Sequence, residues 1–145
     1  MIFGTAFFAI VAAATAATAA ADVATKIVSK EEIMKFITTT NAELTFTGKP
    51  INFKAAKPDA ALDSTVVVYC SSIVENSECG GRCSVYNGDS TCLSTPDTQC
   101  VYASANVALC NGGRCSGSCI DTASCRTFTN NGFCYSPGTE SIQIL

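Results

Sequence analysis

CSSIVENSECGGRCSVYNGDSTCLSTPDTQC occupies residues 70–100 and opens the part of the chain that decides the fold. Residues 70–134 hold all ten cysteines of the 145-residue chain, which has no histidine. In a small exported chain such a density of cysteines indicates disulfides, whereas in a cytosolic chain it would indicate metal binding or catalysis. The predicted structural disulfides therefore involve Cys70, Cys79, Cys83, Cys92, Cys100, Cys110, Cys115, Cys119, Cys125 and Cys134.

The first residues of the chain predict export. Residues 2–13 form an apolar run, and residues 16–21 supply the small side chains that signal peptidase accepts. We therefore expect residues 1–21 to be a cleaved signal peptide and the mature protein to be secreted and extracellular. The alternative is an uncleaved membrane anchor, although this alanine-rich stretch is short for a bilayer core of ~30 Å.

Charge divides the remaining chain into two parts. Residues 22–60 carry six lysines and five acids, whereas residues 61–145 carry three arginines, seven acids and no lysine. Phosphate backbones and anionic lipids repel an acidic surface, so we expect neither a nucleic-acid nor a membrane partner. We expect residues 22–60 to form an N-terminal helix and hairpin segment, and residues 61–145 to form a cysteine-rich β domain.

The N-terminal segment carries the clearest helix signal. Ser29 and Glu32 have the spacing of a capping box, in which each side chain binds a backbone N–H that the helix leaves unpaired. Apolar side chains follow at positions 33, 36 and 37, which lie on one face of a helix. We expect the helix to end within residues 38–41.

A short hairpin is predicted after this helix. Residues 43–47 and 51–54 alternate apolar and polar side chains, and the turn residues Gly48, Lys49 and Pro50 lie between them. The simplest interpretation of the apolar positions is packing in a core. The alternative is that part of residues 22–57 is a propeptide, although no dibasic processing site supports it.

The cysteine-rich part contains only short β-prone pieces, separated by Gly, Ser, Thr and Asn. We expect each piece to bury little apolar surface, so that disulfides rather than a hydrophobic core hold this half in shape. The predicted fold class is small, disulfide-rich and mostly β, with one short N-terminal α-helix. The β-prone pieces are residues 66–69, 85–86, 101–102, 107–109 and 133–135.

An internal echo predicts a two-fold repeat in the cysteine-rich half. Residues 80–84 read GGRCS, and residues 112–116 repeat these letters. The cysteine gaps around them also correspond, because each gap in the second copy is longer by one residue than in the first. Two copies of a small β motif would explain this pattern. Cys70 and Cys119 have no counterpart, and we expect them to pair with each other.

Catalysis, metal binding and cofactor binding are weakly supported. Zinc could use the spacing of Cys79 with Cys83 or of Cys115 with Cys119, but export oxidises thiols and no histidine is present to share coordination. A Ser or Cys nucleophile would lack its usual base. The acids Glu75, Glu78 and Asp89 are nominal candidates for glycoside cleavage, and nothing around them singles one out. We therefore expect no enzyme, no metal and no cofactor.

Binding is the function that remains. The repeated GGRCS letters predict exposed loops in which Arg82 and Arg114 can grip a carboxylate. The structural alternative is that the glycines serve tight turns and the arginines pair with nearby acids. Tyr86, Phe133 and Tyr135 would stack on sugar rings if they were exposed, although the chain has no tryptophan, the strongest platform of this kind.

Several stretches carry a resemblance to a protein group. The chain resembles the small secreted cysteine-rich proteins of mushroom-forming fungi, which are often called effector-like. This resemblance implies export and a role in signalling, in handling a host or substrate, or in competition between microbes, and it implies no active site. The residues that carry it are Val68 to Cys70, Cys79 to Cys83 with Val85 to Gly88, Asn106 to Cys119, and Asn131 to Cys134 with Pro137 to Thr139.

These observations favour a secreted, non-enzymatic, disulfide-stabilised protein that binds an extracellular protein or glycan. Arg82, Arg114 and Tyr86 are the predicted partner contacts. A secreted protease inhibitor or toxin, with one of the two arginines as its anchor, is the first alternative, and a carbohydrate-binding module is the second. Disulfide pairing, oligomeric state, O-glycosylation and the identity of the partner stay open at this stage.

Overall fold

A computed structural model describes residues 27–51 and 64–145. The predicted signal peptide, residues 1–21, lies outside the described residues, and so does the predicted boundary between residues 60 and 61. The structure confirms the predicted fold class, because the described residues form one short α-helix and a seven-stranded sheet cross-linked by disulfides.

The helix α1, Lys30–Thr39, begins and ends where the sequence predicts. Ser29 Oγ accepts a hydrogen bond from the Glu32 N–H at 3.2 Å, and Glu32 Oε2 accepts one from the Ser29 N–H at 3.3 Å. The capping box is therefore complete. Ile33 and Ile37 are buried, which places the predicted apolar face against the rest of the molecule.

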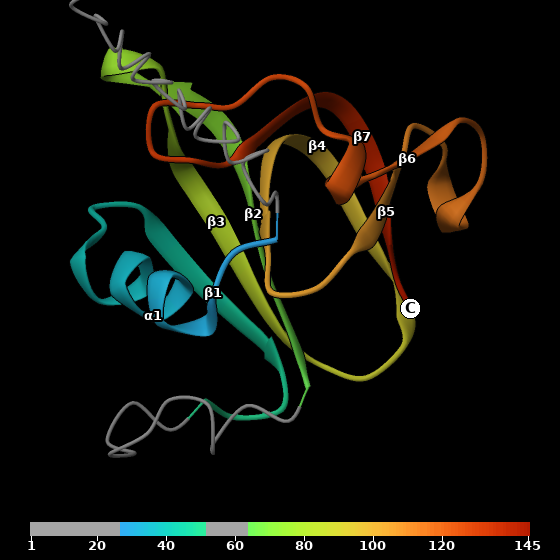
Figure 1. The fold of residues 1–145 in the computed structure, drawn as a ribbon, viewed down its shortest axis with the longest axis horizontal. Coiled ribbons are helices and arrows are strands. Elements are labelled where there is room, and N and C mark those ends of the chain that lie inside the picture. The colour runs from blue at the N-terminus through green and yellow to red at the C-terminus, as the bar shows by residue number, and fades with distance from the viewer. Residues whose placement is uncertain (1–26, 52–63) are drawn as a thin grey trace, which may run out of the picture.

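The sheet has the strand order β1-β3-β2-β4-β7-β5-β6. Neighbouring strands are antiparallel except β1 and β3, which are parallel. Figure 1 shows that β4 and β7 curve, which carries β5 and β6 away from the side of the sheet that holds α1. The strands are β1 (Glu43–Gly48), β2 (Thr65–Val74), β3 (Glu78–Gly88), β4 (Thr91–Ala103), β5 (Val107–Cys110), β6 (Cys119–Asp121) and β7 (Cys134–Ile144).

The predicted hairpin is only partly recovered. Its first arm is a strand, β1, but the described partner of that strand is β3, in a parallel register that places Glu43 opposite Arg82. Residues 52–54 of the predicted second arm lie outside the described residues. Parallel pairing joins segments far apart in the chain, so the local alternation of side chains cannot predict it.

The strands of the cysteine-rich half are longer than the sequence predicts. The short β-prone pieces fall inside or at the start of strands, but β3, β4 and β7 have 11, 13 and 11 residues. The expectation of little apolar burial is therefore wrong. Ser, Thr and Gln continue the ladders between the apolar pieces, because these side chains fit the pleated surface of a strand as readily as they fit a loop.

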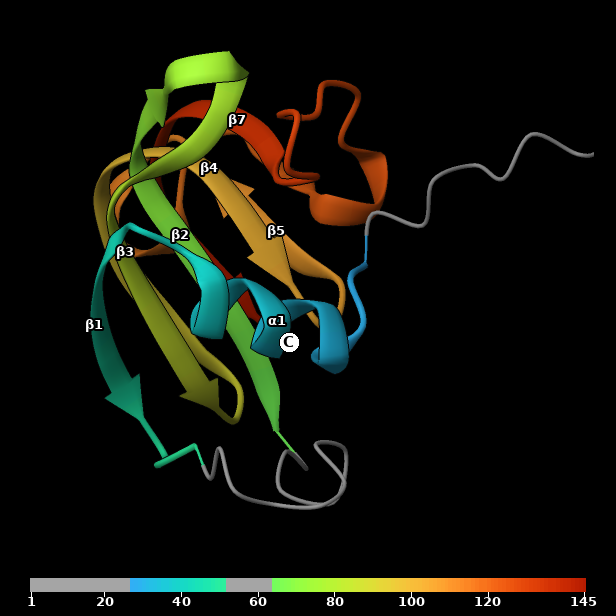
Figure 2. The same ribbon diagram turned by 90° about the vertical axis from the view of Figure 1, so that its left-hand side faces the viewer.

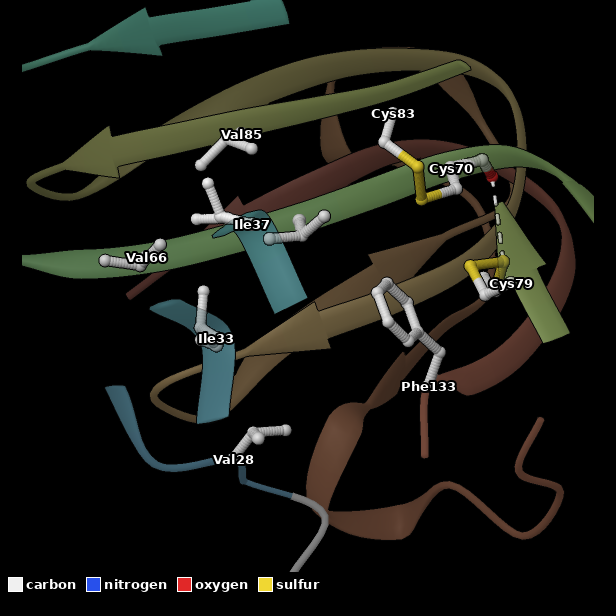
Figure 3. Packing of buried hydrophobic residues seen from close by; sticks show 11 residues of the cluster. Val28, Ile33, Ile37, Val66, Cys70, Cys79, Cys83, Val85 and Phe133 are labelled. Atoms are coloured by element: carbon white, nitrogen blue, oxygen red, sulfur yellow. Dashed lines mark hydrogen bonds between the residues drawn. A yellow bond between two sulfur atoms is a disulfide. The ribbon is translucent and has the colours of Figure 1, made fainter. Parts of the chain in front are cut away.

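Two hydrophobic clusters stabilise the two sides of the curved sheet. In the first, α1 packs against β2 and β3, and Figure 2 shows the helix lying across the strands. Figure 3 shows Ile33 and Ile37 directed at Val66 and Val85. The second lies within the half where we expected little core. It contains Val67, Val101, Ala103, Val107, Leu109, Ile142 and Ile144, each no more than 3% exposed.

All ten cysteines are bonded in five disulfides. The expected Cys70–Cys119 pair is wrong, because both residues bind the cysteine directly opposite them on the neighbouring strand. The strand register places a cysteine opposite each of them, and the spacing of cysteines along the chain does not reveal this register. The pairs are Cys70–Cys83, Cys79–Cys100, Cys92–Cys115, Cys110–Cys119 and Cys125–Cys134.

The internal repeat is not reproduced by the structure. The first and fourth cysteines of the first copy, Cys79 and Cys100, bind each other, whereas their counterparts Cys110 and Cys134 have different partners. The repeated letters also differ in conformation, since Arg82 lies within β3 and Arg114 lies in a 3₁₀ turn. The two segments are therefore similar in sequence but not in structure, within the described residues.

Candidate functional site

A groove of about 620 Å³ lies between the end of α1 and the turn that joins β2 to β3. One wall comes from the last turn of the helix and the residues after it, and the other comes from the β2–β3 turn and the start of β3. The lining residues are Phe36, Thr39, Thr40, Asn41, Ala42, Val74, Glu75, Asn76, Glu78, Cys79, Gly80, Gly81 and Asn131.

A loop from near the end of the chain holds the β2–β3 wall of the groove in place. Asn131 Oδ1 accepts a hydrogen bond from the Cys79 N–H at 2.8 Å, and Asn131 Nδ2 donates one to the Cys79 carbonyl at 3.0 Å. The Asn130 N–H donates to the Ser77 carbonyl at 2.8 Å, and its side-chain amide donates to the Asn76 carbonyl. The turn is therefore fixed by two neighbouring side chains before any partner binds.

Close contact between β2 and β3 explains the two glycines of the groove floor. A Cβ on Gly81, whose φ is +81°, would lie 2.8 Å from the Ser72 Cβ, and one on Gly80 would lie 3.2 Å from Val74 Cγ2. The expectation that residues 80–84 form an exposed loop tip is therefore wrong. They form the interior of a strand, and the glycines serve the close approach of its neighbour.

The groove carries negative charge. Glu75 and Glu78 line it and are exposed, and no lysine or arginine is among the described residues of its lining. These are two of the three acids named as nominal catalytic candidates. The third, Asp89, lies outside this lining, where its Oδ2 atom is 2.8 Å from Lys49 Nζ in an exposed ion pair. The structure thus does not bring the three carboxylates together.

The three predicted partner contacts occupy separate places. Arg82 is exposed on β3, and Tyr86, four residues further along the same strand, is half-buried and donates its hydroxyl to the Asp89 carbonyl at 3.0 Å. Arg82 lines a second, smaller cleft, described below, that does not include Tyr86 or Arg114. Arg114 is exposed in the turn after β5, with a left-handed φ of 57°.

The conformation of the two arginines bears on inhibitor-like binding. A protease inhibitor that binds in the manner of a substrate needs a segment of extended backbone that is free to form hydrogen bonds with the enzyme. The backbone of Arg82 lies in a strand with β1 on one side and β2 on the other. Arg114 is left-handed rather than extended. Neither position offers a free extended segment.

The aromatic residues named for sugar stacking differ in exposure. Phe133 is fully buried, so it does not meet the condition of exposure that stacking on a sugar ring requires. Its ring is stacked on Tyr102 instead, and Phe36 meets it edge-on. Tyr135 is 39% exposed and Tyr86 is half-buried. Phe133 instead belongs to the first hydrophobic cluster.

Chemistry that depends on a thiol is closed to the chain, because every cysteine is in a disulfide. Among residues 27–51 and 64–145, no three His, Cys, Asp or Glu side chains gather as ligands for a metal ion. The polar side chains that line the groove are amides, hydroxyls and two carboxylates, and Phe36, Ala42 and Val74 supply apolar surface. Such a set supplies hydrogen bonds and charge for binding.

Sequence reasoning missed most residues of both concave sites. Asn131 was cited only for the resemblance to a protein group and Asn130 not at all, and Tyr69, Ser84 and Asp97 of the smaller cleft were not predicted as ligand contacts. A cross-strand register would have found two of them, because Tyr69 and Ser84 are direct partners on β2 and β3. Comparison with protein families, with curated proteins and with solved structures finds no match to this chain.

Proposed function

We propose that this protein is a secreted, extracellular binding protein that acts without catalysis, and that the groove at the end of α1 is its recognition site. Five disulfides in a chain of this size are typical of proteins that fold in an oxidising compartment. Within the described part of the chain, no helix has the length and apolar character needed to cross a membrane.

The observation that carries the proposal is the preorganisation of the groove. Cys79 lines the groove and is held by its disulfide to Cys100, with both cysteines no more than 3% exposed, and the amides of Asn130 and Asn131 fix the wall. A surface that is ordered before binding loses less conformational entropy when a partner arrives. The groove contains no thiolate, because every cysteine is oxidised, and the chain lacks histidine, the usual base for a Ser or Thr nucleophile.

Charge and exposed apolar surface describe the partner. Glu75 and Glu78 supply two carboxylates, and the neighbouring Ile73 and Val74 are 38% and 43% exposed. A protein segment that presents a basic side chain next to an apolar one would satisfy both features. The resemblance to fungal secreted proteins implies a narrower, effector-like role. Such a role would depend on the binding of an extracellular partner in this groove.

A peptide-display selection on the disulfide-intact protein tests this function. We expect the enriched peptides to share a Lys or Arg beside an apolar residue. Their binding should weaken in the double variant Glu75→Gln/Glu78→Gln, and it should stop in Asn41→Trp, which fills the groove from an exposed position. The matched control Glu31→Gln/Asp121→Asn removes the same charge from exposed positions that do not line the groove.

Two results would overturn the proposal. One is a selection that enriches no peptide, and the other is binding that is equally strong in the groove variants and in the charge-matched control. Raising the salt concentration should weaken the interaction, because exposed charges are screened within about 10 Å at 0.1 M ionic strength.

A further inference from the structure

A second concave site lies on the face of the sheet opposite to α1. Cys70 and Cys83 are partners on β2 and β3, and their disulfide faces the helix (Figure 3). Side chains alternate between the two faces of a strand, so Tyr69, Arg82 and Ser84 face the other way. They line a cleft of about 250 Å³ together with Cys70, Ser71 and the turn Pro96–Thr98.

The cleft is lined by several hydrogen-bond donors that have no partner among the described residues. The Arg82 guanidinium and the hydroxyls of Tyr69, Ser71 and Ser84 make no hydrogen bond or ion pair with another described residue. Arg82 is exposed, and the three hydroxyl-bearing residues are half-buried. Polar groups that are partly withdrawn from water and lack protein partners are available to a ligand.

Asp97 supplies the acceptor, at a position where the backbone favours glycine. Residues 95–98 of β4 form a turn whose second residue is a proline and whose third residue has a positive φ. Residues 136–139 of β7 form a turn with the same two features. In each, the threonine at the last position donates its hydroxyl to the first carbonyl at 2.8 Å. The third residue is Gly138 on β7 but Asp97, with a φ of 60°, on β4.

The contrast between Asp97 and Gly138 indicates a use for the carboxylate. A left-handed conformation costs an L-residue free energy that glycine does not lose. The two turns lie side by side, since Thr98 and Thr139 are register partners, so the fold itself accepts glycine in this position. The Asp97 side chain lines the cleft that Arg82 also lines, yet no ion pair joins them within the described residues.

We propose that this cleft binds one unit of a neutral saccharide. Arg82 and Asp97 balance in charge, and together with three hydroxyls they match the mixed donors and acceptors of a sugar. A planar guanidinium can bind two neighbouring hydroxyls, and the half-buried Tyr69 ring offers an apolar face. An anionic sugar fits less well, because Asp97 and the net charge of −3 would repel it.

The volume of the cleft agrees with a single sugar unit. At about 250 Å³ it is slightly smaller than the ~300–1,000 Å³ typical of pockets for drug-sized ligands. An open cleft of this size admits one ring of a longer chain. This cleft is distinct from the proposed peptide-binding groove, since the described residues that line the two sites do not overlap.

A glycan array followed by titration calorimetry tests the proposal. We expect the wild type to bind at least one neutral glycan, and Arg82→Ala and Asp97→Gly to bind it about 10-fold or more weakly, as the loss of a charged hydrogen bond implies. The control Arg126→Ala, at an exposed arginine outside the cleft, should bind as the wild type does. The unfolding temperature of Asp97→Gly should equal or exceed that of the wild type, which separates a binding role from a structural one.

The contradicting results are distinct from those for the groove. Absence of neutral glycan binding, or binding that Arg82→Ala and Asp97→Gly leave unchanged, would overturn the proposal. Selective binding of uronate-containing glycans would overturn the neutral ligand class. Glu75→Gln/Glu78→Gln should leave glycan binding intact, and Arg82→Ala should leave peptide binding intact, so failure at one site is separable from failure at the other.

Discussion

The ring of Phe133 lies flat against the ring of Tyr102, with centroids 4.1 Å apart and planes 6° apart. Phe36 meets the same phenylalanine edge-on, at 4.8 Å between centroids. These three rings come from β4, from α1 and from the residue before β7. The stack therefore joins the N-terminal helix to the cysteine-rich half, beside the loop of Asn130 and Asn131 that fixes the groove.

Truncation of Phe133 tests the importance of this stack. Phe133→Ala removes a fully buried ring, and we expect the free energy of unfolding to fall by about 3–5 kcal/mol, the usual cost for a core aromatic. Tyr135→Ala, at a ring that is 39% exposed, should cost much less. Urea unfolding of both variants measures the difference. Equal losses would show that Phe133 is not a core residue.

Tyr102 should titrate above its ordinary value. Burial raises the pKa of its hydroxyl above 10.0, and the nearby Glu32 carboxylate raises it further. The folded state then holds the proton more tightly than the unfolded state does, so this contribution to stability is complete below pH 10 and is lost as the pH rises through the folded pKa. Thermal unfolding should show that Tyr102→Phe loses this part of the alkaline pH dependence.

Glu32→Gln separates the two causes of that pKa shift. Glutamine can still accept the hydrogen bond from Ser29, so the capping box is kept while the charge is removed. We expect the pKa of Tyr102 to move part of the way toward 10.0, because burial remains. Titration of tyrosinate absorbance checks this shift, and a pKa that does not move would remove Glu32 as a cause.

Gly81 and Gly113 hold the same place in the repeated letters but should respond differently to substitution. Gly81 has a φ of +81° and a close neighbour in Ser72, so Gly81→Ala should lower the free energy of unfolding by about 2 kcal/mol. Gly113 has open space and no positive φ, so Gly113→Ala should change it by less than about 0.5 kcal/mol. Similar losses in a denaturant titration would instead indicate that the two segments share one structure.

Removal of different disulfides should have unequal effects. Cys79–Cys100 spans 21 residues and is buried, whereas Cys110–Cys119 spans 9 and includes an exposed cysteine. We expect Cys79→Ala/Cys100→Ala to lose about 2–5 kcal/mol, and about 1 kcal/mol more than Cys110→Ala/Cys119→Ala, because a longer loop constrains the unfolded chain more. Calorimetric unfolding of the two double variants tests the order, and the reverse order would contradict this explanation.

Local signals predicted local structure well. The capping box of Ser29 and Glu32 involves neighbouring residues, and the helix follows it within the expected bounds. The position of β1 followed from alternation, but its partner did not, because a parallel ladder to β3 depends on residues about forty positions away. Cysteine spacing failed for the same reason: Cys70 and Cys83 bind because the strands place them opposite each other.

Turn-forming residues within the strands made the strands look shorter in the sequence than they are in the structure. The last predicted β-prone piece ends at residue 135, but β7 continues through a turn at residues 136–139 to the buried Ile142 and Ile144. In the smaller cleft, residue type alone pointed to Arg82. Asp97 could not be identified from the sequence, because its interest lies in its positive φ. That φ is informative only by comparison with the neighbouring turn, where glycine occupies the same position as Gly138.

The disulfide map of the protein recovered from extracellular fluid tests the central claim most directly, because the two proposed binding sites both depend on the disulfide pairing described above. Peptide mass spectrometry without reduction should recover the links 70–83, 79–100, 92–115, 110–119 and 125–134, with no free thiol. Free thiols, or a fragment that links Cys79 to a cysteine other than Cys100, would contradict the account.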